Sequence, residues 1–175
     1  MNDTLKERVR LFRIVRDIPY YISLEDSMQD YSCVIKPFLL DRLLSTLGVK
    51  SKHILCTFRW GDLSLPRSVL EHAHDPEDTH EFLAVFVPER AEWVTVDPNW
   101  DSSVGHIFRV AEWDGLSDTC LAVTPIKTFS AEESAKIIQE EDTQDPSIRY
   151  AYLERNKDFF QAFNRWLVDQ RVKRA

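Results

Sequence analysis

The stretch DYSC at residues 30–33, with the run VIKPFLLDRLLSTL that follows it at residues 34–47, decides the fold of this chain. In the second run, apolar residues recur three and four positions apart, which is the period of an amphipathic helix, and Gly48 ends it. Pro37 has no amide hydrogen, so the helix begins within a turn before it and Cys33 lies at or beside its N-terminus. Because the positive end of a helix favours a thiolate, the sequence predicts an activated cysteine.

A histidine and an aspartate further along the chain supply the other groups that a cysteine nucleophile needs. They belong to two β-rich runs, HEFLAVFV beginning at His80 and WVTVD ending at Asp97, which are predicted to pair as a hairpin. We expect Asp97 to bind the Nδ1–H of His80 and to leave Nε2 facing Cys33. Asp101 is the alternative carboxylate if the strand register is shifted.

This order of motifs resembles the transglutaminase-like superfamily of papain-like thiol enzymes. The shared features are a cysteine at a helix start, a leucine-rich helix ending in Leu-Gly-Val, a strand, and a histidine followed by Trp-Val-x-Val-Asp-Pro. They span residues 17–101, about half of the chain. The resemblance implies an α+β fold with a papain-like core, in which the nucleophile helix packs on an antiparallel β-sheet, with additional N- and C-terminal helices.

The same resemblance implies a thiol hydrolase or acyltransferase with Cys33, His80 and Asp97 as its catalytic triad and with an acyl-enzyme intermediate. Hydrolysis by a peptidase or amidase is favoured over protein cross-linking, and the substrate would be a peptide, a protein or a small amide. No cofactor is expected. The oxyanion hole would combine the Cys33 N–H with a side chain, for which Gln29 and Tyr31 are the candidates. The alternative is a catalytically inactive transglutaminase-like binding or scaffold module.

The segment before His80 is rich in potential metal ligands. It contains His72, His74, Asp75 and Asp78, and His-x-His is a known chelating pattern. A partner ligand elsewhere in the chain is lacking and His80 already has a role, so we expect no bound metal. The resemblance implies that the segment lies across the mouth of the site, where its acidic and histidine side chains would favour amine-bearing substrates.

Composition narrows the class of protein further. The 175 residues are predicted to form a single domain, with a core over about 17–125 and a C-terminal helical extension over about 130–175. Three cysteines without a CxxC pattern do not make a disulfide framework, and no signal or membrane span is recognised, so a cytoplasmic location is expected. A net charge of -7 opposes binding to nucleic acid.

Flanking elements follow from periodicity and turn signals. Ser130 and Glu133 have the spacing of a capping box at a helix start. The expected helices cover residues 5–18, 131–141 and 147–172, and the expected additional strands cover residues 53–58, 104–111 and 119–124. The aromatic stripe of the last helix is interpreted as core packing.

Overall fold

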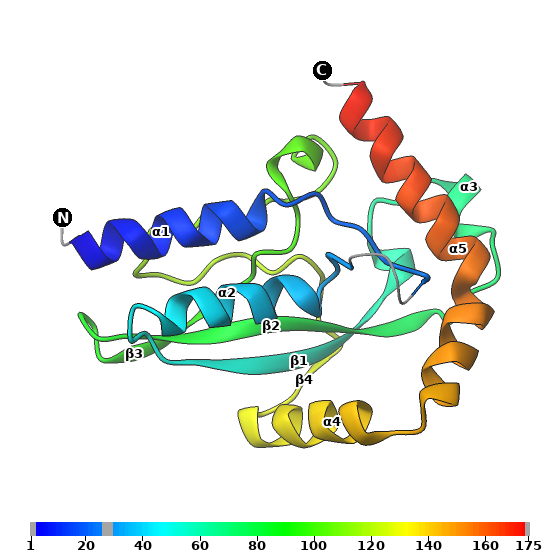
Figure 1. Cartoon of the computed structure of the whole chain (residues 1–175). Coiled ribbons are helices and arrows are strands. Elements are labelled where there is room, and N and C mark those ends of the chain that lie inside the picture. The colour runs from blue at the N-terminus through cyan, green and yellow to red at the C-terminus, as the bar shows by residue number, and fades with distance from the viewer. Residues whose placement is uncertain (1–2, 26–29, 174–175) are drawn as a thin grey trace.

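The structure, a computed structural model, describes residues 3–25 and 30–173. Its centre is a four-stranded antiparallel sheet in the order β3-β2-β1-β4 (Figure 1). The strands are β1 (Ser51–Arg59), β2 (Glu77–Val87), β3 (Glu92–Val96) and β4 (Lys127–Thr128). Helices pack around this sheet, so the predicted α+β class is confirmed. The predicted hairpin is also present as β2 and β3.

The helices cover one face, one edge and one end of the sheet. They are α1 (Asp3–Arg16), α2 (Ile35–Ser45), α3 (Arg67–Leu70), α4 (Ala131–Thr143) and α5 (Pro146–Val172), with short 3-10 turns η1 (Trp60–Asp62) and η2 (Ser102–Val104). Figure 1 shows α2 lying on the sheet with α1 above it, and α5 standing at the end where β2 begins. The helices expected over 131–141 and 147–172 correspond to α4 and α5.

One hydrophobic cluster holds α2 on the sheet. Residues two apart on β2 face α2, because successive side chains of a strand alternate between its faces. The cluster joins these residues to β3, α2 and α1 through Leu83, Val85, Val87, Val94, Val96, Leu40, Leu44, Phe12 and Val15. All of them are buried, and each such side chain contributes about 1.5–3 kcal/mol relative to full exposure. This packing fixes the helix that follows Cys33 against β2.

A second cluster, rich in aromatic residues, attaches α5 to the end of the sheet. Phe159 packs edge-on against Trp60 with ring centroids 5.0 Å apart, and Trp100 stacks on Phe108 at 4.1 Å. Phe163 of α5 is fully buried in the same cluster. The aromatic stripe of the last helix is therefore core packing, as predicted.

Helix α4 lies beside β1 where the two-residue strand β4 leaves the edge of β1 unpaired. The backbone N–H of Leu55 donates to the Ser134 hydroxyl at 3.0 Å. The predicted capping box is present, since Ser130 accepts from the Glu133 N–H and the Glu133 carboxylate accepts from the Ser130 N–H. A covered edge cannot pair with another chain.

Two predicted strands are wrong. Residues 104–111 and 119–124 form no strand; the backbone instead makes tight turns, with the Phe108 N–H donating to the Val104 carbonyl at 3.0 Å. The apolar alternation in these segments reflects single side chains, such as Val104 and Ala111, that enter the core from an irregular chain. Pattern alone does not separate these two cases.

Among the described residues, none of the helices combines the length and apolar character that crossing a membrane requires.

Candidate active site

Cys33 lies two residues before α2 and packs against the beginning of β2. Its Sγ is 3.8 Å from the carbonyl oxygen of Thr79. An Asx turn shapes the approach to it, because the Ser32 N–H donates to the Asp30 carboxylate at 2.7 Å. No described residue accepts a hydrogen bond from the Cys33 N–H, as is usual for amides at a helix start.

The surroundings of Cys33 hold its thiol in the neutral form. Burial, followed by the negative charges of Asp78, Glu81 and Asp30, raises the pKa of Cys33, and the Glu81 backbone N–H only partly opposes this. Burial also raises the pKa of Asp78, whose carboxylate accepts from the Tyr152 hydroxyl at 2.7 Å. This direction is opposite to the thiolate that the sequence predicts at the helix start. Burial and nearby carboxylates outweigh the partial charge of the helix end.

Tyr20 is a neighbour of the thiol that the sequence analysis did not identify. Burial, together with the adjacent Cys33, Asp30 and Asp78, raises the pKa of Tyr20 well above its usual value, and its hydroxyl lies against the Cys33 side chain. The ring is buried and lies 4.8 Å from that of Trp100. Tyr20 therefore brings a hydroxyl donor to the thiol from the segment that follows α1.

His80 on β2 and Asp97 directly after β3 form a buried pair on the two arms of the hairpin. His80 Nε2 lies 2.8 Å from Asp97 Oδ2, and both side chains are 1% exposed. The predicted meeting of the two side chains is confirmed, but the predicted ring nitrogen is wrong, because Asp97 binds Nε2 and not Nδ1. Oδ2 of Asp97 also accepts from the Ala122 N–H at 2.7 Å, so this oxygen accepts both hydrogen bonds.

The other ring nitrogen of His80 is in contact with Asn99, a residue that the sequence analysis gave no role. Asn99 Nδ2 lies 3.1 Å from His80 Nδ1. Cys33 and His80 share no hydrogen bond; the thiol instead contacts the residue that precedes His80 on β2. The Asp-Pro-Asn sequence could have indicated Asn99, since a side chain two residues after Asp97 returns to the same side of an extended chain.

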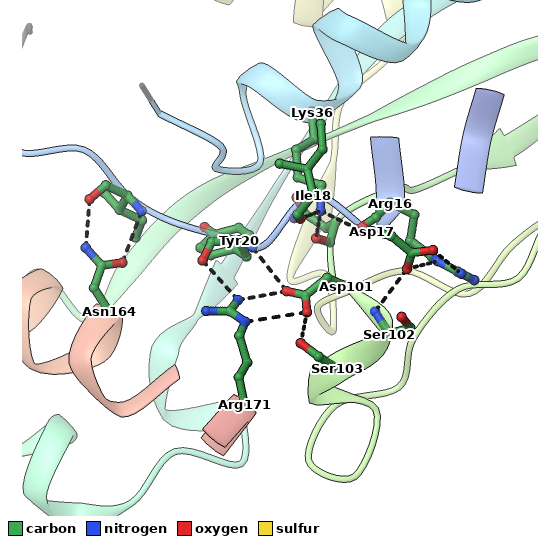
Figure 2. Close-up of polar contacts among 12 residues, drawn as sticks. Arg16, Asp17, Ile18, Tyr20, Lys36, Asp101, Ser102, Ser103, Asn164 and Arg171 are labelled. Carbon is green, nitrogen blue, oxygen red and sulfur yellow. Dashed lines mark hydrogen bonds and ion pairs between the residues drawn. The ribbon is translucent and has the colours of Figure 1, made fainter. Parts of the chain in front are cut away.

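Asp101, the alternative carboxylate, serves a different group. It accepts from the Tyr20 N–H at 3.1 Å, from Ser103 and from Arg171 of α5 at 2.7 Å (Figure 2). Burial alone would raise the pKa of Asp101, but the Arg171 pair and the hydrogen bonds lower it. Asp101 therefore fastens α5 to the segment that carries Tyr20 and is not a partner of His80.

Lys36 of α2 joins the end of α1, the segment that follows α1 and the segment that follows β3. Its fully buried ammonium donates to the carbonyls of Arg16, Ile18 and Asn99 at 2.7, 2.8 and 2.6 Å (Figure 2). Burial lowers the pKa of Lys36 to about 7, against the opposing effect of Asp101 and other nearby carboxylates. The first turn of α2 is thereby tied to the end of α1 and to the segment that follows β3.

A second histidine pairs with carboxylates on the face of the sheet under α2. His53 Nδ1 contacts the Glu81 carboxylate, and its Nε2 lies 3.7 Å from Asp41 of α2. The hydrogen bond with Glu81 raises the pKa of His53. Glu81 also lies next to Cys33, so its carboxylate links this histidine to the surroundings of the thiol.

Of the two residues predicted to contribute to the oxyanion hole, only Tyr31 lies within the described part of the chain. Gln29 lies outside the described residues. Tyr31 is half-buried in the loop before Cys33, and its N–H donates to the Tyr21 carbonyl at 2.9 Å. Its hydroxyl as an oxyanion donor stays a prediction.

The histidine-rich segment packs against α5. The His74 ring stacks on Phe159 at 4.1 Å, and its Nδ1 contacts the His72 carbonyl at 2.7 Å. Asp75 is held by Arg155 at 2.7 Å. Within residues 3–25 and 30–173, no three histidine, cysteine or carboxylate side chains are grouped so that they could hold a metal ion.

Comparisons of the chain with protein-family models, with curated proteins and with solved structures give no match.

Proposed function

We propose that this protein is a transglutaminase-like cysteine enzyme with a papain-like core that hydrolyses amide bonds. Cys33 is the nucleophile, His80 the base and Asp97 the group that orients the base. The observation that carries the proposal is the buried 2.8 Å bond between His80 and Asp97, made on the same strand against which the Cys33 thiol packs. A buried imidazole held by a carboxylate, on a strand that a thiol contacts, supplies the base and the orienting group that nucleophilic cysteine catalysis requires.

The ring orientation assigns the proton transfers. Because Nε2 donates to Asp97, Nδ1 carries the lone pair that accepts the Cys33 proton. The thiolate then attacks the amide carbonyl, and the Cys33 N–H, which has no described acceptor, donates to the resulting oxyanion. The imidazolium returns its proton to the leaving amine as the C–N bond breaks, which gives the thioester. Water, deprotonated by Nδ1, cleaves the thioester to the acid and restores the thiol.

A neutral thiol in the free protein is compatible with this sequence of steps. Proton transfer from Cys33 to His80 moves charge within the site and does not change its total. A substrate that displaces water and brings its carbonyl to the Cys33 N–H favours that transfer at the moment of attack. The enzyme would therefore react with bound substrate faster than with a soluble alkylating agent.

The second candidate is an inactive binding module with the same fold. Two observations favour it, namely the raised pKa of Cys33 and the lack of a hydrogen bond between Cys33 and His80. A binding module would keep the His80–Asp97 pair as a buried structural contact and would form no acyl-enzyme.

Acyl-enzyme formation separates the two candidates. The protein is incubated with p-nitrophenyl acetate, and the acylated cysteine is located by peptide mass spectrometry. We expect acylation of Cys33 to be lost in His80→Gln and slowed by at least about tenfold in Asp97→Asn. Cys120, a half-buried thiol whose Sγ lies 3.9 Å from the Arg109 carbonyl, is the internal control. Equal slow acylation of Cys33 and Cys120, unchanged by the His80 substitution, would refute the enzyme and leave the binding module.

The substrate class is then tested with amides. A set of peptidyl amides that release a fluorescent amine reports hydrolysis directly, and Cys33→Ser is the matched negative control. Product release that depends on Cys33 and His80 would establish amide hydrolysis. Product that appears only when a primary amine is added would instead indicate acyl transfer.

A further inference from the structure

The side chain of Asn99 contacts Nδ1 of His80, the nitrogen that takes the Cys33 proton in the proposed reaction. Its Nδ2 lies 3.1 Å from Nδ1, and the side chain is almost completely buried. A carboxylate can only accept, so the single hydrogen of the neutral imidazole is on Nε2, facing Asp97. Nδ1 then presents a lone pair, and the Asn99 amide donates to it. A donor on that lone pair occupies the position that an incoming proton would take.

The backbone and the side chain of Asn99 are held unequally. The backbone N–H donates to Asp97 Oδ1 at 3.1 Å, and the carbonyl accepts from Lys36 Nζ at 2.6 Å. The side-chain oxygen Oδ1 is buried and has no hydrogen-bond partner among the described residues. A buried amide oxygen without a donor is unfavourable, so the carboxamide can leave His80 at little cost once a donor is offered elsewhere.

We propose that Asn99 acts as a brake on the Cys33–His80 pair, a role that rests on the proposed function. In the free protein its amide covers Nδ1 and prevents His80 from taking the Cys33 proton. A bound amide substrate supplies an N–H to Asn99 Oδ1, the carboxamide rotates about its side-chain torsions, and Nδ1 is released. The thiol proton then moves to Nδ1, the electron pair stays on sulfur, and the Nε2–H bond to Asp97 is kept.

The fixed backbone of Asn99 makes this motion local. Lys36 and Asp97 hold the two ends of the residue, so rotation of the carboxamide does not move the segment that carries Asp97. His80 therefore keeps its orientation while its second nitrogen is uncovered. Asn99 is a positioning residue in this scheme, because it acts through His80.

Two variants of Asn99 test the brake without any substrate. Asn99→Leu keeps most of the side-chain volume and removes the donor, and Asn99→Ala removes both. The rate of Cys33 alkylation by iodoacetamide is followed from about pH 6 to pH 10 by peptide mass spectrometry. We expect the midpoint to fall by about one pH unit in both variants, with alkylation at about pH 7 accelerated about tenfold. Asn156→Ala, which removes another buried carboxamide that bonds Asp75 and Tyr152, is the matched control and is expected to leave the midpoint unchanged.

The tautomer of His80 is a second readout, measured on the native protein by long-range ¹H–¹⁵N NMR. We expect a protonated Nε2 and a hydrogen-bonded lone pair on Nδ1, and in Asn99→Leu the Nδ1 resonance moves to that of a free lone pair. A native ring protonated on Nδ1 would overturn the proposal even if neither variant folds. So would folded Asn99 variants whose Cys33 midpoint is unchanged or raised.

These results are distinguishable from failure of the proposed function. A lowered midpoint in the Asn99 variants, with no acyl-enzyme from the activated ester, would leave the brake in place and remove the hydrolase. Acyl-enzyme in the native protein, with an unchanged midpoint in the variants, would leave the hydrolase and overturn the brake.

Discussion

Replacing Lys36 by methionine tests whether the buried ammonium holds the site together. The substitution keeps an unbranched side chain of similar length and removes all three donors. The carbonyls of Arg16, Ile18 and Asn99 lose their shortest contacts, at 2.6 to 2.8 Å, in a place where the side chain is fully buried. Hydrogen bonds from a charged donor contribute about 1.5–3 kcal/mol each. Three of them therefore amount to about 4.5–9 kcal/mol.

The cost of burying the ammonium offsets part of this sum. Desolvating a buried ion costs several kcal/mol, and the Lys36→Met variant avoids this cost because methionine carries no charge. We expect a net loss of about 3 kcal/mol in the free energy of unfolding, and water admitted to the carbonyls would reduce it. The measurement belongs at about pH 6, below the pKa of about 7 that burial gives Lys36, so that the ammonium form is compared.

Urea unfolding followed by tryptophan fluorescence gives this free energy. Lys136→Met is the control, because Lys136 is exposed and lies 3.8 Å from Glu140, so its loss is expected to change stability by less than about 0.5 kcal/mol. The reasoning about Lys36 fails if Lys36→Met loses less than about 1 kcal/mol, or if it is more stable than the native protein.

Three further predictions concern titrating groups. Native Cys33 is expected to be alkylated with a midpoint above the value of about 8.5 for a free thiol, and a lower midpoint would contradict the raised pKa. The raised pKa of His53 contributes to the free energy of unfolding, and this contribution is complete below about pH 6.5 and is lost as the pH rises through the folded-state pKa. The difference in free energy of unfolding between the native protein and Glu81→Gln should therefore shrink over that pH interval. A constant difference would exclude this linkage. The lowered pKa of Asp101 contributes to the free energy of unfolding above about pH 4, and this contribution is lost as the pH falls through the folded-state pKa. Arg171→Met should therefore lower the free energy of unfolding by about 2 kcal/mol at neutral pH and by less in acid, as measured by urea unfolding.

The parts of the fold that the sequence predicted are those set by local pattern. The helix after Cys33 and the hairpin between His80 and Asp97 follow from apolar periodicity and a short polar turn, and both are present. Their pairing brought two side chains together that lie 17 positions apart in the chain. Pattern was also enough to separate the aromatic stripe of α5 from a binding surface.

The parts that it did not predict depend on contacts between distant segments. Tyr20 reaches the thiol from the segment after α1, and Asp78 is placed beside it partly by Tyr152 of α5. These neighbours determine whether Cys33 is a thiol or a thiolate, and no local pattern describes them. The same holds for Lys36, whose position on the buried side of α2 reads in the sequence as an ordinary polar helix residue.

The attachment of α5 has a consequence for how the protein is made. Arg171 near the end of this helix binds Asp101 and the Tyr20 carbonyl, and Asn164, about two turns earlier on the same face, binds the backbone of Ile22 (Figure 2). A ribosome produces the segment from Tyr20 to Cys33 long before it produces residue 171. Until then Tyr20 lacks its contact with Arg171, so the surroundings of the thiol assemble only after α5 has been synthesised. In a nascent chain that lacks α5, we therefore expect Cys33 to be more accessible to solvent than in the folded protein.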